Sequence, residues 1–417
     1  MPFAIIKRFC VGLATLLACA SSCHALTHLT GNLIVEAQRL ENFSRVVFGE
    51  GSNNYVAPTP VEWAQFRALA QSLWTGDTNA AATQATALGY ELFTFTDTNW
   101  NAFLYGVRSQ ETNGSPVKGW GTYLVNPGSA VPALIEAPHP QWDFRTPLLA
   151  AEIFLKSGAR GLLIAGAHRH VNGDSTGDPC DLTNTIFHAV HEQWSGPAAT
   201  NLAWQVHGFN PANHPGFPVG TLAVLSTGKD GDNFFSTNLV HLDQRLEWNG
   251  IKSYAYAKNL ATNAPLNLLV NEGVDGQTFT NLGARSNVQG DFCHAAGGDF
   301  LHIEMATFTR TNVLMRSLVA DAIACAVLLS RTNAADELTP FALAQPAWEN
   351  GQLRFQVPTE RHRAYRVELA TNLTDAPWQP VRALPGNGQS LSVTNSLPAG
   401  EKVFLRVVNE DSPPPDN

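Results

Sequence analysis

The stretch from residue 131 to residue 206 alternates short apolar runs with helix-like segments. Its apolar runs read VPALIE, GLLIA and LAWQV, at 131–136, 161–165 and 202–206, and helix-like segments at 147–157 and 182–194 separate them. Strands and helices that alternate in this way are typical of an α/β domain with a largely parallel sheet. We therefore predict a three-layer α/β sandwich around a mainly parallel or mixed sheet.

The segments on either side extend this domain over residues 26–335. Upstream, Thr59-Pro60-Val61-Glu62 has the spacing of a capping box with proline at the first helical position, so a helix begins there. Asn113-Gly114 predicts the tight turn of a β-hairpin, and residues 26–125 form an α+β part. Downstream, we expect strands at 221–226, 266–270 and 300–305, and a long helix over 311–330.

Residues 340–409 follow a different pattern, with short segments of alternating polarity. These segments, at 353–357, 364–369, 390–393 and 403–408, suit a small β-sandwich. They resemble the fibronectin-like carboxy-terminal modules of secreted bacterial proteins. The polar tail 410–417 contains three consecutive prolines, and we expect it to be disordered.

The first 25 residues have the zones of a secretory signal peptide. They carry Lys7-Arg8, an apolar run over residues 9–20 and small residues up to Ala25. This run is shorter than the roughly 20 residues of a membrane-spanning helix. We therefore predict export to the periplasm or the extracellular space. Leu16-Leu17-Ala18-Cys19 resembles a bacterial lipoprotein cleavage box, so a lipid anchor at Cys19 is an alternative.

Charge and cysteine content narrow the partners and the covalent chemistry. Lys and Arg number 26 against 35 Asp and Glu, and this net charge of −9 disfavours nucleic-acid binding. Export permits a disulfide, and Cys180 and Cys293, both in polar loop-like stretches, are the candidate pair. Cys325 lies in an apolar helical run and is expected to be a buried thiol. The oligomeric state stays open.

Two histidines and a carboxylate follow the expected strands. His139 and Asp143 come directly after the strand at 131–136, and His207 ends another strand. Ligands bind at the carboxyl ends of strands in open α/β sheets. Two imidazoles and a carboxylate suit an open zinc site, where a coordinated water is the nucleophile. The alternative for each histidine is a hydrogen-bonded structural role.

A carboxylate also lies within the expected strand at 300–306, which reads FLHIEMA. Burying Glu304 there without a partner costs several kcal/mol by the usual order of magnitude. Arg310, six residues later, offers a salt bridge as one explanation. A general base that faces the nucleophilic water is the other.

The ordered set His139, Asp143, His207 and Glu304 resembles the zinc carboxypeptidase-like superfamily. Within it, residues 130–315 are most similar to poly-γ-glutamate hydrolases and N-formylglutamate amidohydrolases. The resemblance implies one zinc ion per chain, Glu304 as the general base, and hydrolysis of amide bonds in peptides or acylated amino acids. The chain departs from the family pattern because Asp replaces Glu, H-x3-D replaces H-x2-E, and Pro140 replaces Gly.

The resemblance also implies an arginine that anchors a substrate carboxylate or the developing oxyanion. Arg169 follows the strand at 161–165 and suits a catalytic role through bidentate contact, with an ion pair to a nearby acid as the equal alternative. Arg145 and Arg310 are the further substrate-binding candidates.

Other classes of function stay open. A catalytically inactive scaffold could bind a polymer or a cell-surface partner through its carboxy-terminal module. Gly173-Asp174-Ser175-Thr176-Gly177 matches G-x-S-x-G and raises a serine hydrolase built on Ser175, although a plain loop is the better interpretation. His188 and His191 form H-x2-H-E, and we expect them to be solvated or to cap a helix.

Overall fold

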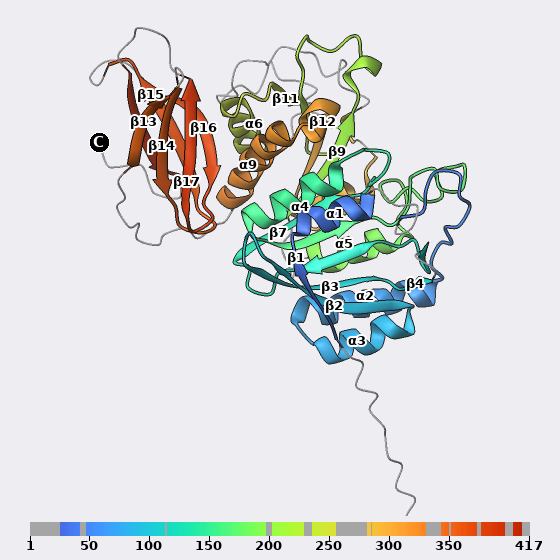
Figure 1. Cartoon of the computed structure of the whole chain (residues 1–417). Coiled ribbons are helices and arrows are strands. Elements are labelled where there is room, and N and C mark those ends of the chain that lie inside the picture. The colour runs from blue at the N-terminus through green and yellow to red at the C-terminus, as the bar shows by residue number, and fades with distance from the viewer. Residues whose placement is uncertain are drawn as a thin grey trace, which may run out of the picture.

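The computed structural model describes residues 26–41, 47–112, 115–196, 202–228, 236–255, 282–284, 286–330, 343–349, 352–372, 377–396 and 403–410. The expected signal peptide, the strand at 266–270 and the tail from 411 lie outside these ranges. A ten-stranded sheet between two layers of helices forms the large domain, and two small antiparallel sheets follow it (Figure 1). The predicted α/β fold with a carboxy-terminal β-sandwich is confirmed.

The large sheet is parallel at its centre and mixed at its edges. In spatial order its strands are β1 (Thr27–Gly31), β2 (Tyr90–Asp97), β3 (Ala102–Ser109), β6 (Thr122–Val125), β8 (Ala159–Ile164), β7 (Val131–Ala137), β9 (Leu202–Phe209), β12 (Asp299–Ala306), β10 (Ala223–Ser226) and β11 (Ser253–Ala255). The four central strands, from β8 to β12, run parallel. On their two sides β6 and β10 pair antiparallel.

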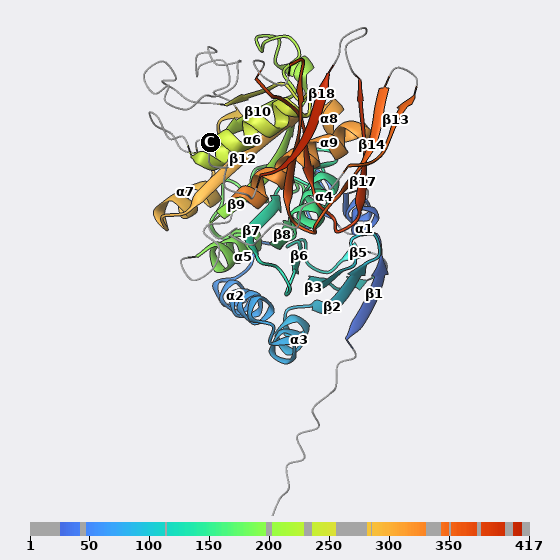
Figure 2. The ribbon, with the colours of Figure 1, turned by 90° about the vertical axis from the view of Figure 1, so that its left-hand side faces the viewer.

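Helices cover both faces of the sheet, each over its own apolar cluster. One face carries α1 (Leu33–Glu41), α4 (Thr146–Ser157), α6 (Thr237–Trp248) and α9 (Val313–Leu329). The other face carries α2 (Pro60–Thr75), α3 (Thr78–Ala87), α5 (Ile186–Ser195) and α7 (Val288–Ala295). Figure 2 shows α5 and α7 on the opposite side of the central strands from α4 and α9.

Local capping signals explain several helix boundaries. The capping box of Thr59 and Glu62 forms as predicted at the start of α2. Helix α5 begins at residue 186 rather than 182, because the Thr185 side chain caps it by accepting from the His188 amide. The expected helix 311–330 is divided at Asn312, which separates the short α8 (Thr307–Thr311) from α9 and accepts from the Met315 amide. Helices α6 and α7 were not predicted from the sequence.

Short hairpin strands β4 (Glu111–Thr112) and β5 (Ser115–Pro116) flank the predicted turn, and the 3-10 turn η1 (Pro211–Asn213) follows β9. Among the described residues, no helix combines the length and the apolar character needed to cross a membrane.

The carboxy-terminal module consists of two three-stranded antiparallel sheets around a core of Phe355, Val357, Tyr365 and Val367. Its strands are β13 (Ala344–Glu349), β14 (Gln352–Pro358) and β17 (Ser390–Ser396) in one sheet, and β16 (Gln379–Pro385), β15 (Ala364–Ala370) and β18 (Phe404–Asn409) in the other. The module contacts the end of α6 through the Asn249 side chain. Asn249 Oδ1 accepts from the Ala383 amide, and Asn249 Nδ2 donates to the Ala383 carbonyl.

Candidate metal centre

The carboxyl ends of β7 and β9 lie where the direction of the connections in the sheet reverses. From β7 the chain crosses to β8 on one side, whereas β9 lies on the other side of β7. Such a reversal of connection is where ligands bind in open α/β sheets. His139 follows β7, His207 lies in β9, and both side chains are buried. The structure therefore brings together two residues that are 68 positions apart, as the sequence predicted.

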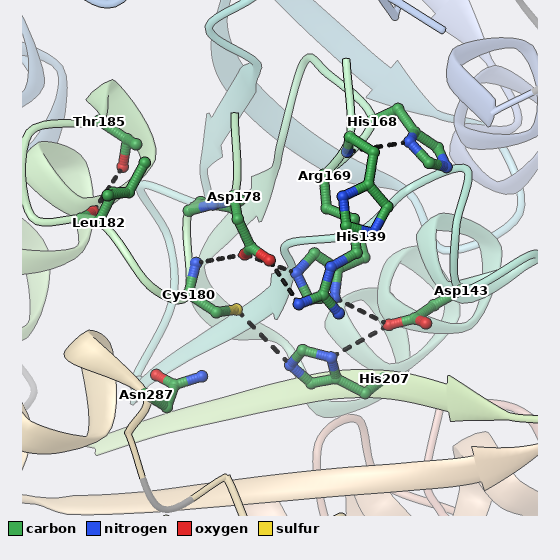
Figure 3. Close-up of polar contacts among 12 residues, drawn as sticks. His139, Asp143, His168, Arg169, Asp178, Cys180, Leu182, Thr185, His207 and Asn287 are labelled. Carbon is green, nitrogen blue, oxygen red and sulfur yellow. Dashed lines mark hydrogen bonds and ion pairs between the residues drawn. The ribbon is translucent and has the colours of Figure 1, made fainter. Parts of the chain in front are cut away.

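Asp143 lies between the two imidazoles. Its Oδ2 is 3.2 Å from His139 Nδ1 and 3.0 Å from His207 Nδ1 (Figure 3). The Asp143 amide donates to the His139 carbonyl across 2.9 Å, so the H-x3-D spacing forms a turn that directs the carboxylate back to the histidine. Ligand atoms of a tetrahedral zinc ion lie about 3.3 Å apart, which is close to these two of the three separations among the ligand atoms.

The outer nitrogen of each imidazole faces an acceptor. His139 Nε2 lies 3.0 Å from Asp178 Oδ1, and His207 Nε2 lies 2.8 Å from Gln205 Oε1. Metal-binding histidines commonly donate their second ring N–H to such oxygens. Arg169 in turn contacts Asp178 Oδ2 across 2.6 Å. The ion pair, one of the two alternatives for Arg169, is thus the one that forms.

This arrangement fits a cation. A neutral imidazole has a single N–H, so it cannot donate to acceptors at both ring nitrogens. If the Nε2–H groups donate to Asp178 and Gln205, the Nδ1 lone pairs of His139 and His207 both point toward the Asp143 carboxylate. Three lone-pair donors that face one another repel unless a proton or a metal ion lies between them.

The pKa values of these three residues reflect the same conflict between burial and charge. Burial opposes ionisation of Asp143, but its contacts with His139 and His207 outweigh burial and hold the pKa of the carboxyl well below its usual range. Burial also opposes a charge on His139, yet Cys180, Asp143 and Asp178 together raise its pKa well above the usual value. For His207, burial is the largest effect and lowers the pKa. These shifts favour a protonated His139 and a neutral His207 at neutral pH.

Among the described side chains, two groups have ligand atoms that all lie within 4.8 Å of one another and could hold a metal ion, and neither includes Asp143. His139, Cys180 and His207 form one, and His207, His302 and Glu304 form the other. Cys180 lies on the opposite side of the imidazole pair from Asp143 (Figure 3), with its sulfur 4.0 Å from His207 Nε2. Burial raises the pKa of this thiol to about 11. His207 belongs to every set, so it is the common element of the centre.

The predicted cysteine pairing is not formed. Cys180, Cys293 and Cys325 are all free and buried, and only the assignment of Cys325 as a buried thiol agrees with expectation. Cys180 instead belongs to the loop that brings Asp178 to the centre, where its amide donates to Asp178 Oδ1.

Glu304 lies beside His207 because the two residues are register partners in β12 and β9. Its Oε1 is 3.6 Å from His302 Nε2, whereas Oε2 is buried without a hydrogen-bond partner. Burial, reinforced by the negative charge of Asp143, raises the pKa of Glu304 to about 8. His302 was missed in the sequence, although it alternates with Ile303 and so shares the face of Glu304.

The guanidinium group of Arg310 is bound to backbone carbonyls. It donates from Nε to the Met305 carbonyl across 3.0 Å and from Nη1 to the Phe144 carbonyl, and Nη2 approaches the Phe209 carbonyl. These contacts join the ends of β12 and β9 to the turn that carries Asp143. Arg310 therefore holds the walls of the site. The contact of the Glu304 carboxyl is with His302, 3.6 Å away, and burial lowers the pKa of this imidazole well below its usual value. The positive charge of Arg310 partly offsets the burial that raises the pKa of Glu304.

Arg145 lies at the rim of the centre. It is the residue before α4, has a φ of 73°, and stacks over the Phe144 ring at 4.7 Å. The aromatic residues on either side of Asp143 are exposed, Trp142 by 51% and Phe144 by 43%. Arg145 and the two exposed aromatic residues thus lie within two positions of Asp143 in the chain, and Arg169 lies 6.0 Å from the Trp142 ring.

The prediction of solvated or capping histidines on α5 is wrong. His188 and His191 are both buried. His191 Nδ1 lies 2.7 Å from Glu136 Oε1, and its Nε2 lies 3.5 Å from the Cys293 sulfur. Burial opposes a charge on His191, but Glu136 and Cys293 outweigh burial and raise its pKa to about 10. The partners of His191 come from β7 and α7, so helical spacing could not reveal them.

Ser175 is exposed in the loop between β8 and α5. A nucleophile elbow needs a strand immediately before the serine and a helix immediately after it. Neither lies next to Ser175, so the local structure does not favour the serine hydrolase.

Comparisons with protein-family models, with curated proteins and with solved structures found no match. The likeness to the zinc carboxypeptidase-like superfamily therefore stays a prediction. The functional proposal rests on the geometry of the centre.

Proposed function

We propose that the chain is an exported, zinc-dependent hydrolase of amide bonds in peptides or acylated amino acids. The observation that carries this proposal is the meeting of His139 Nδ1, Asp143 Oδ2 and His207 Nδ1, while both Nε2 atoms face acceptors. A zinc ion held by three such ligands supplies a Lewis acid that polarises a carbonyl and activates water.

The chain's own groups support the rest of the reaction. Glu304 Oε2, buried beside His207 without a hydrogen-bond partner, would in its ionised form take a proton from the attacking water and return it to the leaving nitrogen, and its pKa of about 8 implies that this form is favoured at mildly alkaline pH. Arg145, which follows Phe144 and precedes α4, is the residue that meets a substrate carboxylate in this proposal. Trp142 and Phe144 offer apolar surface to the part of the substrate next to the scissile bond.

The Asp143 set is favoured over the Cys180 set for a geometric reason. A metal on the Nε2 side must displace the contacts of His139 with Asp178 and of His207 with Gln205, which are 3.0 and 2.8 Å long. A metal on the Nδ1 side leaves both contacts in place and uses them to orient the rings.

The metal content of the secreted form, residues 26–417, tests this assignment. We expect about one zinc per chain in the wild type, loss in His139→Ala and in His207→Ala, and weakened binding in Asp143→Asn. Cys180→Ser is the matched control and should keep its zinc. Loss of zinc in Cys180→Ser, with full binding in Asp143→Asn, would move the metal to the other side of the imidazoles.

A wild type that cannot be loaded with zinc contradicts the metallohydrolase. If zinc is bound, turnover of peptides and N-acyl amino acids separates an enzyme from a binding protein on the same scaffold. Complete absence of turnover across both substrate classes would favour the binding protein.

A further inference from the structure

A row of polar side chains crosses the sheet beneath the centre. Glu136 of β7 is the register partner of Gln205 of β9, which in turn is the register partner of His302 of β12. All three lie on the face covered by α5 and α7, and all three are buried. Burying such polar side chains costs free energy unless each is hydrogen-bonded. The hydrogen-bond partners of this row therefore determine how its side chains are oriented.

The contacts of Gln205 determine which way its amide points. Its Nε2 donates to Glu136 Oε2 across 3.0 Å and to Gln289 Oε1 across 3.3 Å, and its Oε1 accepts from Asn287 Nδ2 across 2.6 Å. A carboxylate only accepts, so the NH2 group has to face Glu136. The amide oxygen consequently faces His207 Nε2, at 2.8 Å.

Glu136 is itself held on its other oxygen. Its Oε1 lies 2.7 Å from His191 Nδ1, so each carboxylate oxygen has a separate partner. The carboxylate therefore cannot turn away from Gln205 without losing one of two buried contacts. His191 of α5 thereby holds the Glu136 side chain of β7 in the orientation that meets Gln205 of β9.

The geometry points to Glu136 and Gln205 as positioning residues for the metal. We propose that Glu136 orients the Gln205 amide, that the amide oxygen accepts the Nε2–H of His207, and that His207 therefore presents its Nδ1 lone pair to the ion. This inference rests on the proposed function, because it takes the Nδ1 side as the metal side. Neither residue touches the ion or the substrate.

Zinc affinity of the full secreted chain, measured by competition with a chromophoric chelator, tests the relay. Gln205→Leu removes the acceptor and should weaken zinc binding about 10- to 100-fold. Glu136→Gln allows the neighbouring amide to turn either way and should weaken zinc less. Asn238→Leu is the matched control, because it removes a side-chain amide of α6 that donates to Asp299 Oδ2, away from this row, and it should bind zinc as the wild type does.

The double variant separates positioning from general loosening of the fold. If Glu136 acts through Gln205, adding Glu136→Gln to Gln205→Leu should cost no further affinity. Additive losses would overturn the relay, as would zinc affinity equal to the wild type in Gln205→Leu. Thermal unfolding of the metal-free variants controls for misfolding.

The tautomer of His207 gives a second readout that does not depend on affinity. Long-range ¹H–¹⁵N correlations of the zinc-loaded wild type should show the proton on Nε2, and a His207→Ala sample identifies the signal. A proton on Nδ1 in the zinc-loaded protein would overturn the relay even though zinc is bound. A wild type that binds no zinc would instead remove the proposed function itself.

Discussion

The two faces of β9 and β12 carry opposite chemistry. Toward α4 and α9, the strands present Val206, Ile303 and Met305 within one large apolar cluster. Toward α5 and α7, the same strands present His207 and Glu304, together with Gln205 and His302. Adjacent residues of a strand point to opposite faces, so a single stretch of chain supplies both surfaces.

This difference shows what each face contributes. Apolar burial stabilises a fold in proportion to the area removed from water. The hydrogen bonds and ion pairs of buried polar groups offset their desolvation cost only when every partner is in place. The partnerless Oε2 of Glu304 and the acceptors that face one another around Asp143 fall short of that condition. The polar face is therefore where a bound ion and a reaction are expected, and the apolar face is where stability is expected.

The largest expected effect comes from the polar face. Glu304→Gln keeps the shape of the side chain but removes the group that accepts a proton, so kcat on an amide substrate should fall about 10²- to 10⁴-fold. Zinc content and the unfolding midpoint should change little. Turnover and metal analysis of the same sample check this, and a fully active variant would show that another group acts as the base.

The neighbouring residue on the opposite face should behave in the reverse way. Ile303→Ala leaves a cavity in the apolar cluster and should cost about 2–5 kcal/mol in free energy of unfolding. Zinc affinity of the folded variant should match the wild type. Urea denaturation followed by fluorescence measures the loss. A drop in zinc affinity without a drop in stability would contradict the division between the two faces.

The layer behind the polar face should make stability depend on alkaline pH. The pKa of His191 is about 10 in the folded chain, against about 6.5 when unfolded. Its stabilising charge is thus fully present below about pH 6.5 and is lost as pH rises through about 10. In His191→Gln the fall of the unfolding midpoint between pH 7 and pH 10 should be shallower than in the wild type. Parallel curves would mean that His191 is neutral in the fold.

The smallest expected effect lies away from both faces. Thr59→Ala removes the side chain that caps α2 and should cost about 1 kcal/mol. Zinc binding and turnover should stay at wild-type values, because α2 packs on α5 and does not reach the centre. Chemical denaturation is the measurement. A change in activity here would show that the centre is coupled to its distant helices.

Local patterns of the sequence determined much of the fold and part of the centre. Apolar runs between helical segments predicted the parallel sheet, because burial on both faces requires such runs. The capping box at Thr59 located α2 within one residue. His139, Asp143, His207 and Glu304 were recognisable because each follows or interrupts a predicted strand. The strand order then brings them together at one edge of the sheet.

Only the tertiary structure decided what surrounds these residues. Asp178 and Cys180 reach the centre from a loop, and the path of a loop has no periodicity that a sequence could reveal. The pairing of Glu136 with Gln205 depends on register between β7 and β9, which local propensity does not encode. Alternation along a strand tells which face a side chain occupies. Which partner it meets there depends on packing between segments far apart in the chain.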